Sequence, residues 1–212
     1  MAIICPTVLA DNSQTFREQI RRVEALSPRL QIDLSDGDFA PVTTLPLEQV
    51  QWRDGQRVDL HLMYRRPGEF LEAAAGLRPN LIIVHAEAEA GEVEGVFERA
   101  GDVKLGLALL PQTDPNQADV RAWLEEADHC LIFAGELGRF AEEADLTQLN
   151  KVELIRAVNT EIEIGWDGGV NEGNIARLAA AGVDVINVGG FIQKAADPAA
   201  AYAILQQIVN KV

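Results

Sequence analysis

The stretch Leu81-Ile82-Ile83-Val84-His85 is a nearly continuous apolar run, and Lys104-Leu105-Gly106-Leu107-Ala108-Leu109-Leu110 is a second one further along the chain. Between the two runs lies Glu92–Arg99, which has the composition of a helix. Strands that helices cover on both faces read as continuous apolar runs and are typical of parallel sheets. The stretch therefore predicts a strand–helix–strand unit of an α/β protein.

The same unit recurs along the whole chain of 212 residues. Eight apolar runs read as strands at a spacing of roughly 25 residues, and helix-like segments separate most of them. The predicted strands are Ile3–Leu9, Leu30–Leu34, Val58–Met63, Leu81–His85, Lys104–Leu110, His129–Ala134, Glu161–Trp166 and Val185–Val188. The predicted helices are Ser13–Leu26, Pro67–Ala75, Glu92–Arg99, Gln117–Glu125, Leu146–Val158, Glu172–Ala181 and Pro198–Val209, with Leu47–Trp52 as a short turn of helix.

Eight such units in this length favour a closed (β/α)8 barrel, the TIM barrel, and an open eight-stranded α/β sheet is the alternative. The chain shows no linker and no low-complexity stretch. Its length lies within the range of one barrel domain and is enough to bury a sizeable core. We therefore expect a single TIM-barrel domain that covers residues 1–212.

The composition argues against several classes of partner. The formal net charge is −15, and so acidic a surface repels the phosphate backbone of nucleic acids. No apolar run approaches the roughly 20 residues that span a bilayer, and Met1–Pro6 lacks the basic start of a signal peptide. We expect a cytoplasmic protein without a membrane partner. Cys5 and Cys130 lie in apolar runs outside any Cys-x-x-Cys pattern, which predicts buried, unreactive thiols.

Polar residues gather where the predicted strands end, and this is where barrels of this kind build their sites. Side chains alternate along a strand, so Gln31, Asp33 and Ser35 share one face, as do Asp59 and His61. One buried polar side chain is more often a satisfied core residue than a ligand. Several that converge offset their burial cost jointly, through a metal ion or a proton-transfer network. The other polar residues at strand ends are Thr7, Asp36, Asp38, His85, Glu87 and Asp167.

Two glycine pairs, Gly168-Gly169 and Gly189-Gly190, follow the last two predicted strands. Barrels often bind phosphate in these two loops through backbone N–H groups, although tight turns also require glycine. The pairs therefore favour a phosphate site modestly. The four lysines, Lys104, Lys151, Lys194 and Lys211, lie outside the C-terminal halves of the predicted strands. A Schiff-base aldolase is correspondingly disfavoured.

Ordered motifs run through the whole chain and together resemble the ribulose-phosphate 3-epimerase family. They are Pro6-Thr7-Val8-Leu9, Gln31-Ile32-Asp33-Leu34-Ser35-Asp36-Gly37-Asp38-Phe39-Ala40-Pro41, Asp59-Leu60-His61-Leu62-Met63, His85-Ala86-Glu87-Ala88, Gly106-Leu107-Ala108-Leu109 with Pro111-Gln112-Thr113, Trp166-Asp167-Gly168-Gly169-Val170, Gly182-Val183-Asp184 and Gly189-Gly190. So many matches in order are specific for the superfamily and less specific for one activity.

The resemblance implies a barrel of the ribulose-phosphate-binding type and an isomerase of carbohydrate and pentose-phosphate metabolism, a ketose-phosphate 3-epimerase. In that family one aspartate removes the proton at C3 and another returns it on the opposite face, through a metal-stabilised enediolate. By position the aspartates are Asp33 and Asp167. The implied ligands of a divalent zinc, manganese or iron ion are Gln31, Asp33, His61 and Asp167. Thr7 would bind the sugar of a small sugar-phosphate substrate and Gly168, Gly169, Gly189 and Gly190 its phosphate, with a homo-oligomer left open.

The sequence departs from the family pattern at four places, one of which is Gly190, which replaces a serine but still leaves a backbone donor. Gln31 replaces a histidine ligand, and a neutral amide oxygen is a weaker ligand than imidazole for zinc or iron. Ser35 replaces a methionine above the site. In the loop Ala134–Arg139, Glu136 has the wrong charge for phosphate, which Arg139 could offset.

These departures keep two alternatives open. One is a catalytically altered or inactive epimerase-like barrel that binds a sugar phosphate or a protein partner. The other is a decarboxylase that acts through an enediolate. We rank the decarboxylase last, because the Asp-x-Lys-x-x-Asp signature of that group is missing.

Overall fold

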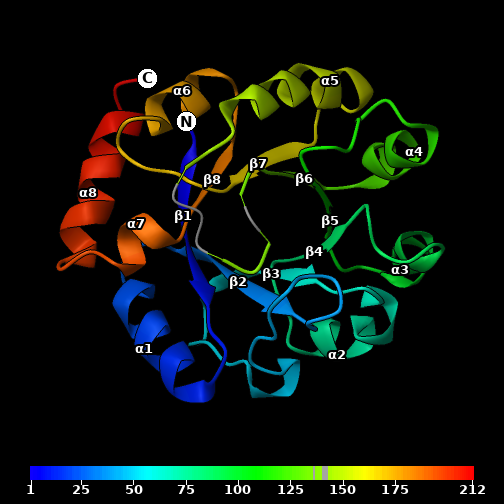
Figure 1. Ribbon diagram of the computed structural model, residues 1–212, viewed down its shortest axis with the longest axis horizontal. Helices are drawn as coiled ribbons and strands as arrows, with labels where there is room; N and C mark the ends of the chain where they lie inside the picture. The colour runs from blue at the N-terminus through cyan, green and yellow to red at the C-terminus, as the bar shows by residue number, and fades with distance from the viewer. Residues whose placement is uncertain (136, 140–142) are drawn as a thin grey trace.

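The computed structural model describes residues 1–135, 137–139 and 143–212. Its eight parallel strands follow one another in chain order and close into a barrel (Figure 1), which confirms the predicted TIM barrel. The closing pair joins the first and last strands, with Ile4 opposite Ile186. The strands are β1 (Ile3–Leu9), β2 (Arg29–Ser35), β3 (Arg57–Met63), β4 (Leu81–His85), β5 (Leu105–Leu109), β6 (His129–Phe133), β7 (Glu163–Asp167) and β8 (Val185–Val188).

Helices surround the barrel and cover the outer faces of the strands (Figure 1). They are α1 (Ser13–Val23), α2 (Leu71–Gly76), α3 (Glu92–Arg99), α4 (Ala118–Glu126), α5 (Asn150–Val158), α6 (Ile175–Ala180), α7 (Gly190–Gln193) and α8 (Pro198–Val209), with the 3₁₀ turns η1 (Leu47–Gln49), η2 (Pro67–Glu69) and η3 (Leu146–Leu149). Among the described residues, none of the helices is long and apolar enough to cross a membrane.

The predicted and observed elements differ at several places, among them the predicted helix Leu146–Val158, which is divided into η3 and α5. The predicted helix Pro67–Ala75 is divided into η2 and α2, since the Phe70 N–H closes a tighter turn onto the Pro67 carbonyl. The predicted strand Glu161–Trp166 starts later, because Asn159 Oδ1 accepts the Glu161 N–H in a turn. The strand also ends later, because Asp167 pairs with Phe133 and Asn187, so Asp167 is the last residue of β7 and not the first residue of the loop. The short α7 was not predicted.

Alternation along the strands separates two kinds of core. The outward side chains, such as Ile32, Leu60 and Trp166, belong to a large apolar cluster under the helices. A second, small apolar cluster fills the lumen beside β4, β5 and β6, and it consists of Leu81, Ile83, Ala108 and Leu131. The rest of the lumen is polar, and its polarity positions the candidate site.

Both cysteines are buried and free, as predicted. Burial raises the pKa of both thiols, which keeps them protonated and unreactive.

Candidate active site

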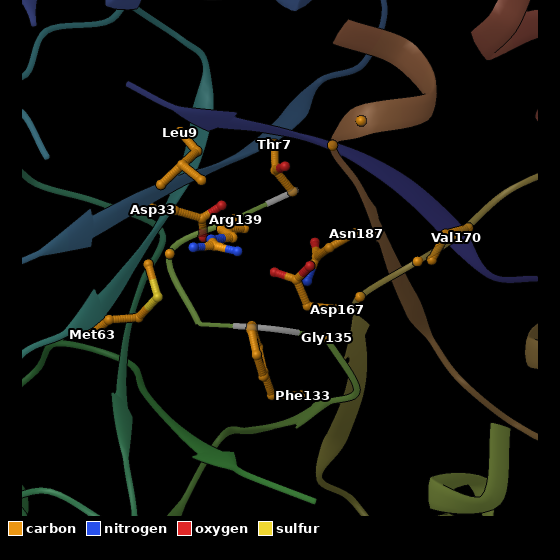
Figure 2. A pocket seen from close by; sticks show the side chains of 15 residues that line it. Thr7, Leu9, Asp33, Met63, Phe133, Gly135, Arg139, Asp167, Val170 and Asn187 are labelled. Carbon is orange, nitrogen blue, oxygen red and sulfur yellow. The ribbon is translucent and has the colours of Figure 1, made fainter. Parts of the chain in front are cut away.

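A pocket opens at the C-terminal ends of the strands and encloses about 470 Å³ of space, counting its mouth. Figure 2 shows side chains from several strands directed into it. Seven of the residues predicted for the site line this pocket, namely Thr7, Asp33, Asp167, Gly168, Gly169, Gly189 and Gly190. The other two, Gln31 and His61, are fully buried and contact its carboxylates from below.

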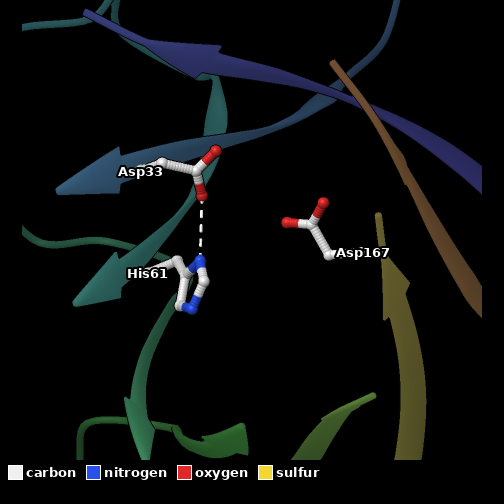
Figure 3. A group of neighbouring side chains, drawn as sticks. All are labelled: Asp33, His61 and Asp167. Carbon is white, nitrogen blue, oxygen red and sulfur yellow. Dashed lines mark hydrogen bonds and ion pairs between the residues drawn. The ribbon is translucent and has the colours of Figure 1, made fainter. Parts of the chain in front are cut away.

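Strand register brings the polar side chains together. In the pairing of β2 with β3, Asp33 lies opposite His61, and Asp33 Oδ1 is 2.9 Å from His61 Nδ1. Asp167 comes from β7, beyond β1 and β8 in the barrel wall. Figure 3 shows the Asp33 and Asp167 carboxylates and the His61 ring facing a common space. One ligand atom from each of these three residues lies within 4.8 Å of the others, so the three form a group that could hold a metal ion.

Gln31 connects the two carboxylates. Its Nε2 donates to Asp33 Oδ1 at 2.8 Å and to Asp167 Oδ2 at 2.6 Å. Its Oε1 is buried without a hydrogen-bond partner among the described residues, which is costly for a polar atom. A half-turn of the amide would direct that carbonyl oxygen toward the same space as the carboxylates. The four side chains therefore fit a divalent ion, as an oxygen-rich set that includes one imidazole.

Electrostatics separate the two aspartates. Burial and then the charge of Asp33 raise the pKa of Asp167 well above its usual range, even though Gln31 and the Gly168 N–H donate to it. Two close carboxylates share a site most readily when one of them holds a proton or a cation lies between them. A carboxyl group with a raised pKa that shares a pocket with a second carboxyl group is an arrangement that acid–base pairs use.

The first glycine pair has a structural reason. Gly168 has φ +125° and Gly169 φ +63°, conformations that other residues rarely adopt. A Cβ atom on Gly168 would collide with the Gly135 backbone nitrogen, and one on Gly169 would collide with the Glu143 carbonyl carbon. Close packing of two loops thus explains both glycines, so their presence alone does not identify a phosphate site.

Several polar residues at strand ends have structural partners. Ser35 Oγ donates to the Val42 carbonyl. Asp36 accepts the backbone N–H groups of Phe39 and Arg65, and so shapes the loop after β2. Asp59 lies at the other end of the lumen, bound to Arg29.

The pocket also contains residues that sequence reasoning missed. Asn187 is buried, lines the pocket, and has an Oδ1 without a hydrogen-bond partner in the described part of the chain. Its signal was one polar residue within the apolar strand Val185–Val188. Met63 and Phe133 supply apolar lining. Arg139, which was predicted to compensate for Glu136, also lines the pocket, whereas Glu136 itself lies outside the described residues.

Comparison with known sequences places this geometry in context. A family model described as "Ribulose-phosphate 3 epimerase family" matches residues 3–193. Ribulose-phosphate 3-epimerase of Helicobacter pylori is 30% identical over 216 residues, which cover 97% of each chain. The enzyme of the same name from Mycobacterium leprae is 31% identical over 215 residues, which cover 97% of this chain and 94% of the relative.

Solved structures share the fold at lower identity. A 3-keto-L-gulonate-6-phosphate decarboxylase from Vibrio cholerae superposes with a TM-score of 0.76 at 12% identity, covering 99% of this chain and 98% of that one. KGPDC from Streptococcus mutans gives 0.73 at 12% identity, covering 100% of this chain and 99% of that one. A 3-hexulose-6-phosphate synthase from Salmonella typhimurium gives 0.74 at 15% identity, covering 99% of each chain. At these identities the likeness concerns the fold alone.

Proposed function

The chain belongs to the ribulose-phosphate 3-epimerase family, and from that premise we propose that it epimerises a ketose phosphate at C3. The observation that supports this proposal best is the pair Asp33 and Asp167. The two carboxylates come from separate strands, face one pocket and are bridged by a single amide. Inversion at a carbon next to a carbonyl group needs one base and one acid on opposite faces of that carbon.

In this mechanism the ionised aspartate removes the C3 proton, and the protonated aspartate returns a proton to the opposite face. The raised pKa of Asp167 supports the second role for Asp167 and the first for Asp33 in one direction of the reaction. In the reverse direction the roles exchange. Thr7, which lines the same pocket from β1, would hydrogen-bond the sugar between the two carboxyl groups.

We propose that Asp33, His61, Asp167 and the turned amide of Gln31 hold a divalent ion, either zinc, manganese or iron(II). When bound, the ion would neutralise the negative charge that develops on the substrate oxygens. Without the ion, the unturned amide of Gln31 bridges the two carboxylates through its Nε2 instead. The oxygen-rich set favours manganese over softer metals.

The proposed substrate is a small sugar phosphate. The backbone N–H groups of Gly168, Gly169, Gly189 and Gly190 would bind the phosphate, and Arg139 lines the same pocket as a cation. A local site of this kind is needed because the net charge of −15 gives no long-range attraction for an anion. The structural neighbours named for a hexulose phosphate and a gulonate phosphate support this substrate class by analogy of fold.

We further propose that residues 1–212 form one domain and act in the cytoplasm. The closed barrel supports the first point, since β1 pairs with β8 at opposite ends of the chain. The second candidate function is an epimerase-like barrel that binds a sugar phosphate or a protein partner without turnover. The replacement of a histidine ligand by Gln31 is the observation that favours it.

The test is solvent-deuterium incorporation into ribulose 5-phosphate, followed by NMR with zinc, manganese, iron(II) or a chelator. We expect label at C3 with at least one metal, most rapidly with manganese. Label without inversion would indicate that proton removal survives and proton return on the other face does not. Absence of label under all four conditions would contradict the proposal and favour the non-catalytic barrel.

A further inference from the structure

A line of buried polar side chains leads from the candidate metal group outward to the loop after β4. His61 Nδ1 faces Asp33, and His61 Nε2 lies 2.8 Å from His85 Nε2. On the other side of its ring, His85 Nδ1 lies 3.4 Å from Glu87 Oε2. Both histidines are fully buried. Neither His85 nor Glu87 has a role in the proposed mechanism.

Glu87 is held by one of its two oxygens. Its Oε1 accepts the Leu110 N–H at 2.9 Å and the Thr113 hydroxyl. Burial opposes its ionisation, but the hydrogen bonds from His85, Thr113 and Leu110 keep the pKa of Glu87 below its usual range. Its Oε2 and His85 Nδ1 make no hydrogen bond elsewhere in the part of the chain that the structure describes. The free oxygen of a fixed carboxylate therefore faces one ring nitrogen.

Packing fixes the ring that receives this oxygen. The His85 ring lies between Phe39 and Phe133, with centroid distances of 4.8 and 5.8 Å. Its Nε2 shares one hydrogen bond with His61 Nε2, in which one nitrogen donates and the other accepts. A ring held in this way cannot turn to find another partner, and the position of its single proton is the remaining variable.

Counting hydrogens decides that position. If His85 carried its proton on Nε2, its bare Nδ1 would face the carboxylate of Glu87, and two lone pairs would oppose each other. If it carries the proton on Nδ1, it donates to Glu87, and its Nε2 accepts from His61 Nε2–H. A neutral His61 then has a bare Nδ1 that lies 2.9 Å from Asp33 Oδ1, and a metal ion bound by both groups would keep their lone pairs from opposing each other. A metal ligand must present such a lone pair.

We infer that His85 and Glu87 are positioning residues, which hold His61 with its proton on Nε2 and its Nδ1 open to a metal ion. This inference rests on the proposed metal site. The direction of donation runs outward from the site, from His61 to His85 to Glu87. The Glu87 carboxylate, as a hydrogen-bond acceptor, thus determines which nitrogen of His61 carries the proton, although Glu87 does not contact His61.

Glu87→Gln tests this inference sharply. The Leu110 and Thr113 donors need an acceptor, so the amide oxygen takes the Oε1 position and the NH₂ group faces His85 Nδ1. With that donor in place, His85 accepts at Nδ1 and donates from Nε2. His61 then accepts at Nε2 and carries its proton on Nδ1. We expect the dissociation constant for zinc to rise by about 10-fold or more, as is typical of partners of a ligating histidine.

The matched control is Glu89→Gln, the same change two residues later, at an exposed side chain that pairs with Arg65 and Arg66. Zinc affinity is measured by competition with a chelating indicator, and thermal unfolding verifies that both variants are folded. We expect Glu89→Gln to bind zinc like the wild type. If Glu87→Gln also binds like the wild type, the inference is wrong while the metal site stands. If the wild type binds neither zinc nor manganese, both the inference and the proposed metal site fail.

Histidine NMR supplies a readout that a merely structural role would not change. The chain has three histidines, so long-range ¹H–¹⁵N spectra of the zinc-loaded protein are simple to assign. In the zinc-loaded wild type we expect His61 to be protonated on Nε2 and His85 on Nδ1, and in Glu87→Gln without zinc we expect the reverse. A wild-type His85 protonated on Nε2 would overturn the inference.

Discussion

The two ends of the barrel lumen each contain two carboxylates, but they neutralise them differently. At the N-terminal end, Arg29 donates to Asp59 at 2.6 Å and to both oxygens of Glu163, at 2.7 and 2.8 Å. His129 contacts the same Glu163 at 2.9 Å. At the C-terminal end, the Gln31 amide donates to Asp33 and Asp167, the His61 imidazole faces Asp33, and Arg139 lines the same pocket.

The difference separates stability from function. The lower end carries its own permanent cation, so its charges are compensated whether or not a ligand is present. The upper end has two carboxylates bridged by a neutral amide, and a proton or a divalent ion between them would reduce their repulsion. In barrels of this kind the lower face serves stability and the upper face binds ligands, and the charges of this chain follow that division.

The largest expected effect is at the upper end. Asp33→Asn and Asp167→Asn each remove one acid–base group, and we expect C3 exchange to slow by on the order of 10³-fold while the fold is retained. The control is Asp38→Asn, an exposed residue near the same strand end, with unchanged exchange. The measurement is the deuterium exchange rate under saturating substrate. Retention of wild-type turnover in both variants would rule out the two-aspartate mechanism.

At the lower end we expect a loss of stability instead. Arg29→Met leaves Asp59 and Glu163 without their cation, and the free energy of unfolding should fall by about 3 kcal/mol. Removal of one partner of a buried ion pair costs roughly 3–5 kcal/mol, and we expect the low end of that range because the Glu163 side chain is 34% exposed. Arg57→Met, at the same end but exposed, should cost less than about 0.5 kcal/mol. Urea unfolding measures the free energy of unfolding of both variants. Similar losses would show that the buried ion pairs of Arg29 contribute no more to stability than the exposed Arg57.

A smaller effect sharpens the role of the bridging amide. Gln31→His would replace the amide by the imidazole of the family pattern, and we expect zinc affinity to rise roughly tenfold, or about 1.4 kcal/mol. Manganese affinity should change less, because manganese prefers oxygen ligands. Competition with a chelating indicator measures both constants. Equal gains for the two metals would show that the side chain at position 31 does not select the metal.

The smallest expected effect concerns pH, and it should have opposite signs at the two ends. Folding raises the pKa of Asp167, so the unfolded chain releases a proton that the metal-free folded site retains. Stability is therefore lost as pH rises through the raised pKa. At Glu163 burial is outweighed by hydrogen bonds from His129 and Arg29, which lower the pKa. Its stabilisation is present above the usual pKa of glutamate and lost as pH falls.

Thermal unfolding with a chelator, from about pH 4 to pH 8, measures both limbs. We expect Asp167→Asn to remove the alkaline decline, on the order of 1 kcal/mol, and Arg29→Met to weaken the acidic one. Divalent metal should raise the unfolding temperature more at the alkaline end. An unchanged alkaline decline in Asp167→Asn would show that another group causes it.

Much of this arrangement could be predicted from the sequence, because it depends on the alternation of side chains along each strand and on the order of strands and helices along the chain. Alternation along β2 placed Gln31 and Asp33 on one face, and the barrel pattern predicted that Asp33 and Asp167 would meet. The contact of Arg29 with Glu163 joins residues 134 positions apart, and no local pattern reports it. The unpaired oxygen of Gln31 and the facing of His85 and Glu87 depend on side-chain orientation, which a strand pattern does not specify.

The close packing of Gly168 and Gly169 against the backbone at positions 134–135 and 143–144 has a consequence for how this barrel could change. A new segment after β6 has to keep its backbone clear of the β7 loop, and any residue with a side chain at 168 or 169 closes that space. The loops after β6 and β7 are therefore coupled by their packing. A transplant of the loop after β6 from a relative therefore requires the matching loop after β7 as well, and the two loops have to change together in evolution.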